Sequence, residues 1–187
     1  LDIEQSDAGP DVVPDIQPDV PEPPSIAPAR AWRSDIPLIT RDIAALGDGH
    51  VIVGTTSNDF EADEGREAVA IAFDSNGALR WATRLGDEGN DQLTSVTSDG
   101  ELIIAAGVTR QLSGDDPAND DILITEIQPE GTASVWTVGR TGRHEVAWDI
   151  RPGNASTAAW VLAGRERFEG QNDGLLVGLN RDLSFSF

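Results

Sequence analysis

Clustered acidic side chains are the groups in this sequence best suited to chemistry. The densest cluster is the run Asp115-Asp-Pro-Ala-Asn-Asp-Asp121. Carboxylate and amide oxygens are the ligands that Ca²⁺ prefers, although the spacing here is not that of an EF-hand loop. The sequence therefore predicts a candidate calcium site, with Ca²⁺ as the one candidate cofactor. A solvated loop, in which acids simply favour turns, is the alternative interpretation. The candidate ligands are Asp115, Asp116, Asn119, Asp120 and Asp121.

Other chemistry-bearing residues are sparse. His50 and His144 are the only histidines, and neither has a zinc-binding spacing. Cysteine is absent, which excludes disulfides and thiolate metal sites. The sequence also contains no nucleophile elbow of the form GxSxG. We therefore predict no catalytic residues.

The charge of the chain limits its partners. Thirteen basic residues stand against 33 acidic ones, for a net charge of −20. Such a surface repels the phosphate backbone of nucleic acids and anionic membranes. We expect no nucleic-acid partner and consider a protein or a glycan as ligand. No apolar run reaches the roughly 18–20 residues that a transmembrane helix needs.

Residues 1–30 have the composition of a linker. They hold seven of the eleven prolines, interspersed with acids. Proline blocks both helix and sheet, and mutual repulsion of the acids extends the chain. We expect a disordered or polyproline-II-like tether here, with a plain interdomain linker as the alternative.

Residues 31–187 show an all-β pattern with an internal repeat. Short aliphatic segments end in Gly54, Gly107 and Gly164, at intervals of 53 and 57 residues. Trp32, Trp81 and Trp136 recur at similar intervals of 49 and 55 residues. A period of about fifty residues with four short strands is typical of a β-propeller blade.

The middle repeat predicts four strands with hairpin turns at Asx-Gly dipeptides. Trp81 and Trp136 should fill the interfaces between blades, because large aromatic side chains are usually buried. Ten aliphatic residues should pack between neighbouring sheets: Val51, Val53, Val69, Ile71, Leu102, Ile104, Ile122, Ile124, Val161 and Leu176. The predicted strands are Leu93–Thr97, Leu102–Thr109, Ile122–Gln128 and Thr132–Val138.

Residues 66–110 resemble the bacterial seven-bladed β-propeller repeat (SBBP) found in exported proteins, and Asp42–Phe60 resembles another part of that repeat. The loop Gly139–Glu145 departs from the motif. The resemblance implies about three four-stranded antiparallel blades over residues 31–187. Propellers close with roughly four to eight blades, so we expect an incomplete, truncated propeller. The matching features are the strand Glu67–Phe73, the turn Asp74–Gly77, Trp81, the loop Gly86–Asp91, Asp99-Gly100, Gly107 and Thr109.

Two functions remain open at this point, because a fold does not specify an activity. The first is a non-enzymatic module for binding, scaffolding or adhesion. We expect it outside the cytoplasm, secreted or held by a lipid anchor encoded upstream. The second is a propeller-fold enzyme, such as a hydrolase, lyase or quinone-dependent oxidoreductase, with its site in blades beyond this sequence.

Overall fold

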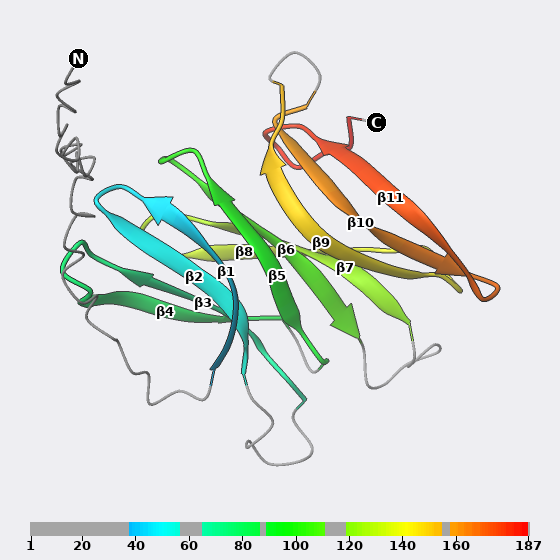
Figure 1. Cartoon of the computed structure of the whole chain (residues 1–187), viewed down its shortest axis with the longest axis horizontal. Helices are drawn as coiled ribbons and strands as arrows, with labels where there is room; N and C mark the ends of the chain where they lie inside the picture. The colour runs from blue at the N-terminus through cyan, green and yellow to red at the C-terminus, as the bar shows by residue number, and fades with distance from the viewer. Residues whose placement is uncertain (1–37, 57–64, 87–88, 111–118, 155–157, 187) are drawn as a thin grey trace, which may run out of the picture. The chain divides into compact units, whose positions relative to one another are not determined.

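The computed structural model describes residues 38–56, 65–86, 89–110, 119–154 and 158–186. These residues belong to one compact unit, Trp32–Phe187. They form eleven strands in three antiparallel sheets, and none of them is helical (Figure 1). The predicted all-β class is therefore confirmed.

Each sheet is a meander in which consecutive strands pair in sequence order. The first sheet contains β1 (Leu38–Leu46), β2 (Gly49–Thr56), β3 (Ala68–Phe73) and β4 (Leu79–Leu85). The second contains β5 (Gln92–Ser98), β6 (Ile103–Arg110), β7 (Asp120–Ile127) and β8 (Ala133–Val138). The third contains β9 (His144–Pro152), β10 (Trp160–Phe168) and β11 (Gln171–Leu179). The four strands predicted for the middle repeat thus lie within two residues of the observed ones.

Local turn chemistry explains why the hairpins form where they do. Between β3 and β4, the Asp74 carboxylate accepts hydrogen bonds from the N–H groups of Asn76 and Ala78, each at 2.8 Å. Gly77 follows with a φ of +78°, a conformation that costs glycine little. The turn therefore stops β3 and reverses the chain into β4.

The middle sheet is buried on both faces because its side chains alternate between two cores. In β6, Ile103 and Ala105 pack against the first sheet, whereas Ile104 and Ala106 pack against the third. All four are fully buried. This arrangement explains why β6 is a continuous apolar run instead of an alternating one.

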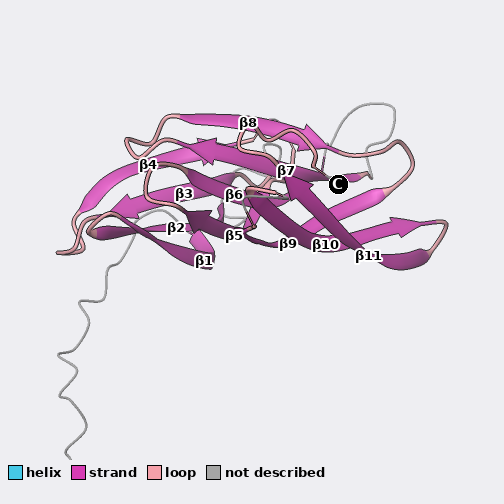
Figure 2. Cartoon of the chain, turned by 90° about the horizontal axis from the view of Figure 1, so that it is seen from above, coloured by secondary structure: helices cyan, strands magenta, loops and turns pink. Residues whose placement is uncertain are grey.

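The sheets are in closest contact through their first strands. β5 lies against β1 on one side and against β9 on the other, whereas the outer strands β4 and β8 barely meet. Figure 2 shows β1, β5 and β9 on one side of the sheets and β8 on the other. The three sheets therefore converge on β1, β5 and β9.

A β-bulge interrupts each of these first strands at the same place. The residue left without a partner in the ladder is Arg41 in β1, Thr94 in β5 and Trp148 in β9. A bulge adds one residue to a strand and bends it locally. Because all three sheets carry it, the bend is a repeated feature of the fold.

The recurring glycines lie in the second strands and pair with the residue next to each bulge. A Cβ atom added to Gly54, Gly107 or Gly164 would lie 2.0, 1.9 or 2.2 Å from a carbonyl oxygen of the first strand. No side chain fits there, so the repeat requires glycine for close backbone approach.

The structure differs from the sequence-based expectations at three points. The third sheet has three strands among the described residues, followed by an isolated bridge between Leu179 and Phe185. Leu176 is 61% exposed, because its neighbours in β11 face the second sheet and it faces away. Trp136 is 40% exposed and does not fill an interface. Trp81 does, since it packs against the core between the first and second sheets, and its indole N–H donates to the Pro129 carbonyl in the turn between β7 and β8 at 2.7 Å.

We predict that Gly107→Ala destabilises the protein by about 2 kcal/mol, the range seen for overpacking. The added methyl group would have to displace the backbone of β5 at Gln92. Urea unfolding measures the effect as a lower transition midpoint. Gly174→Ala in β11 is the control, because a Cβ there meets open space, and it should leave the midpoint unchanged. Equal midpoints for both variants would contradict this explanation of the glycine.

Candidate functional site

The residues that follow the bulges form a polar cluster where the three sheets converge. They are Asp42 in β1, Ser95 in β5 and Asp149 in β9, at intervals of 53 and 54 residues. The Ser95 hydroxyl oxygen lies 2.8 Å from Asp42 Oδ2 and 2.8 Å from Asp149 Oδ1. We call these three residues the axial cluster. One hydroxyl thus joins strands from all three sheets.

Backbone groups and one arginine complete the axial cluster. Ile150 N–H donates to the Ser95 hydroxyl oxygen at 3.3 Å, and Val96 N–H donates to Asp42 at 3.0 Å. Arg151 approaches Asp149 to 3.0 Å. A hydroxyl has one hydrogen, so Ser95 donates to one carboxylate at a time. Ser95 is buried, which makes the loss of these bonds costly.

The axial cluster holds Asp42 in its ionised form. Partial burial acts to raise the pKa of Asp42. Hydrogen bonds from Val96 N–H, the Ser95 hydroxyl and Ile43 N–H, together with the charge of Arg151, outweigh burial and lower the pKa below its ordinary value of 3.8. Donors to a carboxylate stabilise its charged form, which is why the direction is downward.

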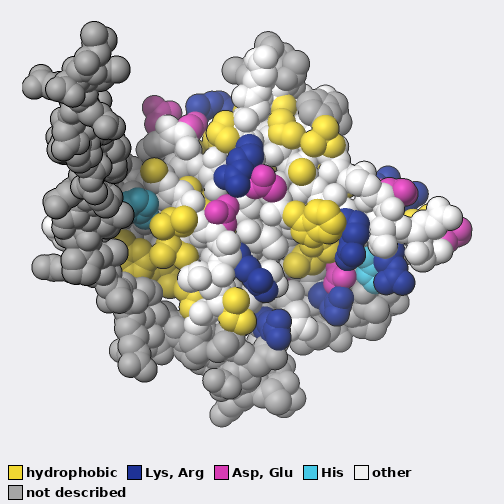
Figure 3. Space-filling model, viewed as in Figure 1, with side chains coloured by type: hydrophobic (Ala, Val, Ile, Leu, Met, Phe, Trp, Pro, Cys, Tyr) yellow, Lys and Arg dark blue, Asp and Glu magenta, His cyan; other side chains and the backbone are white. Residues whose placement is uncertain are grey.

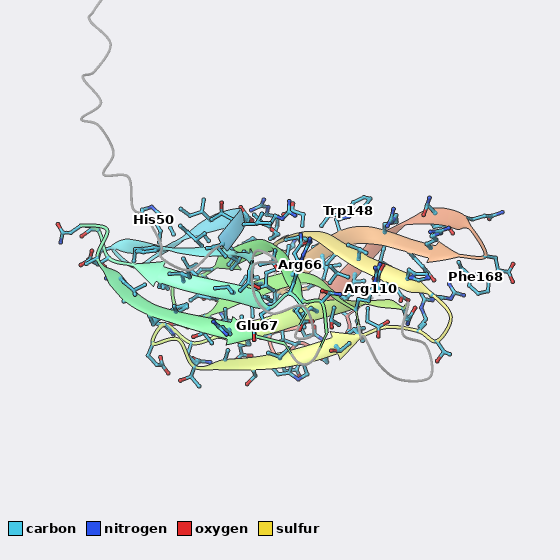
Figure 4. All side chains as sticks on the ribbon, turned by 90° about the horizontal axis from the view of Figure 1, so that it is seen from below. His50, Arg66, Glu67, Arg110, Trp148 and Phe168 are labelled. Atoms are coloured by element: carbon cyan, nitrogen blue, oxygen red, sulfur yellow. The ribbon has the colours of Figure 1, made fainter. Side chains whose placement is uncertain are left out.

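A second polar feature is a cavity of about 490 Å³ at the ends of the strands. It lies where β5 begins, where β6 ends and where β7 begins. Residues of the second and third sheets line it, together with the segments just before β3 and β5. Figure 4 looks onto this end and shows Arg66 and Arg110 near the middle of the view. The lining residues are Arg66, Asn90, Asp91, Gln92, Val108, Arg110, Asp120 and Val146.

Backbone hydrogen bonds fix the loop that forms one wall of the cavity. Asn90 and Arg110 exchange two of them, at 2.8 and 3.1 Å. Asp91 N–H donates to the Arg66 carbonyl at 2.6 Å, and Arg66 N–H donates to the Asn90 side chain at 3.1 Å. The Thr55 hydroxyl donates to the Asp91 carbonyl at 2.9 Å. The wall is therefore tied to both the first and the second sheet.

An ion pair orients the main basic group of the cavity. Arg110 donates to both oxygens of Asp120, from Nε at 2.5 Å and from Nη2 at 2.9 Å. This two-pronged pairing is the strong geometry of arginine with a carboxylate. The hydrogen bond to Asp120 raises the pKa of Arg110 further above its ordinary value. His144 Nδ1 lies 3.6 Å from the same carboxylate.

The predicted calcium ligands are only partly covered by the described residues. Asp115 and Asp116 lie outside them. Asn119 and Asp121 are brought together, with Asn119 Nδ2 donating to Asp121 Oδ1 at 2.9 Å, whereas Asp120 is paired with Arg110. Within the described ranges no three His, Cys, Asp or Glu side chains gather as a metal site would need. The calcium site stays a prediction.

Sequence reasoning missed both the axial cluster and the cavity. The signal for the axial cluster was present, because Asp42, Ser95 and Asp149 recur at nearly the interval of the glycines. The loop Gly139–Glu145 departs from the repeat in sequence, but it shares one structural feature with the loop Gly86–Asp91, a buried acid at its end. It ends in Glu145, which is buried just before the bulged part of β9, as Asp91 is buried just before β5. No sequence signal linked Arg66 to Arg110.

Comparison with known proteins gives little functional information. No family model matches the chain. An uncharacterized protein of Aquifex aeolicus (strain VF5) is 28% identical over 117 residues, which is 63% of this chain and 30% of that protein. The chain thus matches less than a third of the length of this relative. In the described residues we find no helix with the length and apolarity needed to cross a bilayer.

We predict that Ser95→Ala destabilises the protein by about 1–3 kcal/mol, the cost of leaving buried hydrogen-bonding groups unsatisfied. The substitution removes the hydroxyl that joins Asp42, Asp149 and Ile150 N–H. Thermal and urea unfolding measure the loss. Ser134→Ala, at an exposed serine of β8 whose hydroxyl bonds none of the described residues, is the control and should be neutral. Unchanged stability of Ser95→Ala would show that the three first strands do not depend on this hydroxyl.

We predict that Asp42 supports stability in a pH-dependent way. Its pKa is lower in the folded protein than in the unfolded chain, so its contribution is present above about pH 4 and is lost as the pH falls through the folded value. The stability difference between the wild type and Asp42→Asn should therefore shrink on acidification. Urea midpoints from pH 7 to pH 3 measure it. A stability difference that stays constant from pH 7 to pH 3 would contradict this role of Asp42.

Proposed function

We propose that the three sheets are consecutive blades of a β-propeller that serves as a non-catalytic binding, scaffold or adhesion module. The main support for this proposal is the first strand of each sheet, which has the same features in all three sheets. In a propeller, the blades are four-stranded sheets arranged around a central channel. The convergence of β1, β5 and β9, each bulged at the same position, is the arrangement that such blades require.

The outer faces of the first and third sheets support the same proposal. On the first sheet, Val69, Ile71 and Phe73 lie on the face of β3 opposite the residues that pack on the second sheet. On the third, Leu176 projects away from the second sheet. Apolar residues on both faces of every sheet are needed when each blade packs between two others.

The surface and the linker support a role in binding outside the cytoplasm. The chain carries a net charge of −20, and residues 1–30 have the acidic, proline-rich composition of a spacer. Figure 3 shows arginine side chains spread among acidic and apolar ones on the face that carries β1, β5 and β9. We propose a protein or glycan partner and an extracytoplasmic location, either secreted or held by a lipid anchor.

Single cysteines can test both the architecture and the compartment, because the chain has none of its own. Leu176→Cys and Glu130→Cys would be expressed from the complete gene in intact cells and treated with a small maleimide that does not cross the cytoplasmic membrane. We expect labelling of Cys at position 130, on an exposed turn, and protection at position 176 by a further blade.

Two outcomes would contradict the proposal in different ways. Labelling of neither cysteine before lysis, followed by labelling at position 130 after lysis, would place the protein in the cytoplasm. Equal labelling at both positions would leave the third sheet uncovered and remove the support for a propeller.

A further inference from the structure

Among the described residues that line the 490 Å³ cavity, the arginines are more exposed than the acids. Two acids and two arginines line it, but they differ in accessibility. The Asp91 residue is 0% exposed and the Asp120 side chain 14%. The Arg110 side chain, by contrast, is 49% exposed, and Arg66 is half-buried. The described lining, with two acids and two arginines, thus has no net negative charge, in a chain whose net charge is −20.

The cavity also offers hydrogen-bond donors that the described protein leaves unused. Arg110 uses Nε and Nη2 on Asp120, and within the described ranges its Nη1 has no partner. The Asn90 side chain accepts from Arg66 N–H through Oδ1, which leaves its NH₂ group available. The side chain of Gln92 makes no hydrogen bond with the described residues and adds a further amide. These donors come from fixed elements, since Asn90 and Arg110 are tied by two backbone bonds.

The size and the remaining walls limit the ligand. A cavity of about 490 Å³ is large enough for a small organic molecule and exceeds what a bare inorganic ion requires. Val108 from β6 and Val146 from β9 provide an apolar wall. A guanidinium group binds carboxylate and phosphate through the same paired geometry.

We propose that this cavity binds a small organic oxyanion, a carboxylate or a phosphate ester, with its charged group held by Arg66 and Arg110. Asn90 and Gln92 donate to the polar part of the molecule, and the two valines contact its carbon skeleton. The proposal specifies a ligand class for the binding module proposed above. It needs only residues of this chain and no further blade, so it can fail while the propeller assignment stands.

Calorimetric titration with three matched probes tests the ligand class. Glucuronate, glucose 6-phosphate and glucose share one ring and differ at C6, where they carry a carboxylate, a phosphate or neither. We expect at least one of the two anions to bind and glucose not to bind. The anion that binds distinguishes the carboxylate from the phosphate ester. Binding of neither anion, or equal binding of glucose, would overturn the proposal.

Three variants locate the binding site. Arg66→Gln and Arg110→Gln should each weaken binding of the anion by about tenfold or more, the loss expected for one charge-assisted hydrogen bond. Arg181→Gln is the matched control, since Arg181 is also an exposed arginine paired with an acid, Asp99, outside the cavity. It should leave the affinity unchanged. Circular dichroism verifies that each variant folds. If Arg110→Gln does not fold, Arg66→Gln alone still tests whether the anion binds in the cavity. Unchanged affinity in a folded cavity variant would place the anion elsewhere.

Discussion

Close contact between two backbones is the constraint on which the rest of this structure depends. In each sheet, a glycine of the second strand lies against the first strand at a β-bulge, where a Cβ would come within 2.2 Å of a carbonyl oxygen. The contact bends the first strand in the same way in all three sheets. The bulged strands carry Asp42, Ser95 and Asp149 to one place, between the two cores that flank the second sheet.

Much of this fold could be predicted from the sequence, because its determinants are local. The strands of the middle sheet follow from aliphatic segments and from turns such as Asp99-Gly100, which act within a few residues. The importance of Gly107 was visible from its recurrence, but the physical reason was not. Only the register of β5 and β6 shows that the glycine faces a bulge.

The functional features were harder to predict because they join residues from different sheets. Arg66 lies before β3 and Arg110 is the last residue of β6, and the sequence gives no sign that they line one cavity. The exposure of Leu176 depends on which face of β11 meets the second sheet, and a one-residue change of register would reverse it. Similarly, the pairing of Asp120 with Arg110 could not be inferred from an acidic run that looked suited to calcium.

The bulges leave one position per sheet at which the residue type differs between the sheets. Arg41, Thr94 and Trp148 occupy this position, and a cation, a small hydroxyl and a large aromatic group are all accepted. The neighbouring glycine and the polar residue after the bulge recur in all three sheets, whereas the contact of the Thr94 hydroxyl with the Ala147 carbonyl, at 2.8 Å, is specific to β5. The repeat can therefore carry different side-chain chemistry at this position in each sheet while the bulged backbone stays the same.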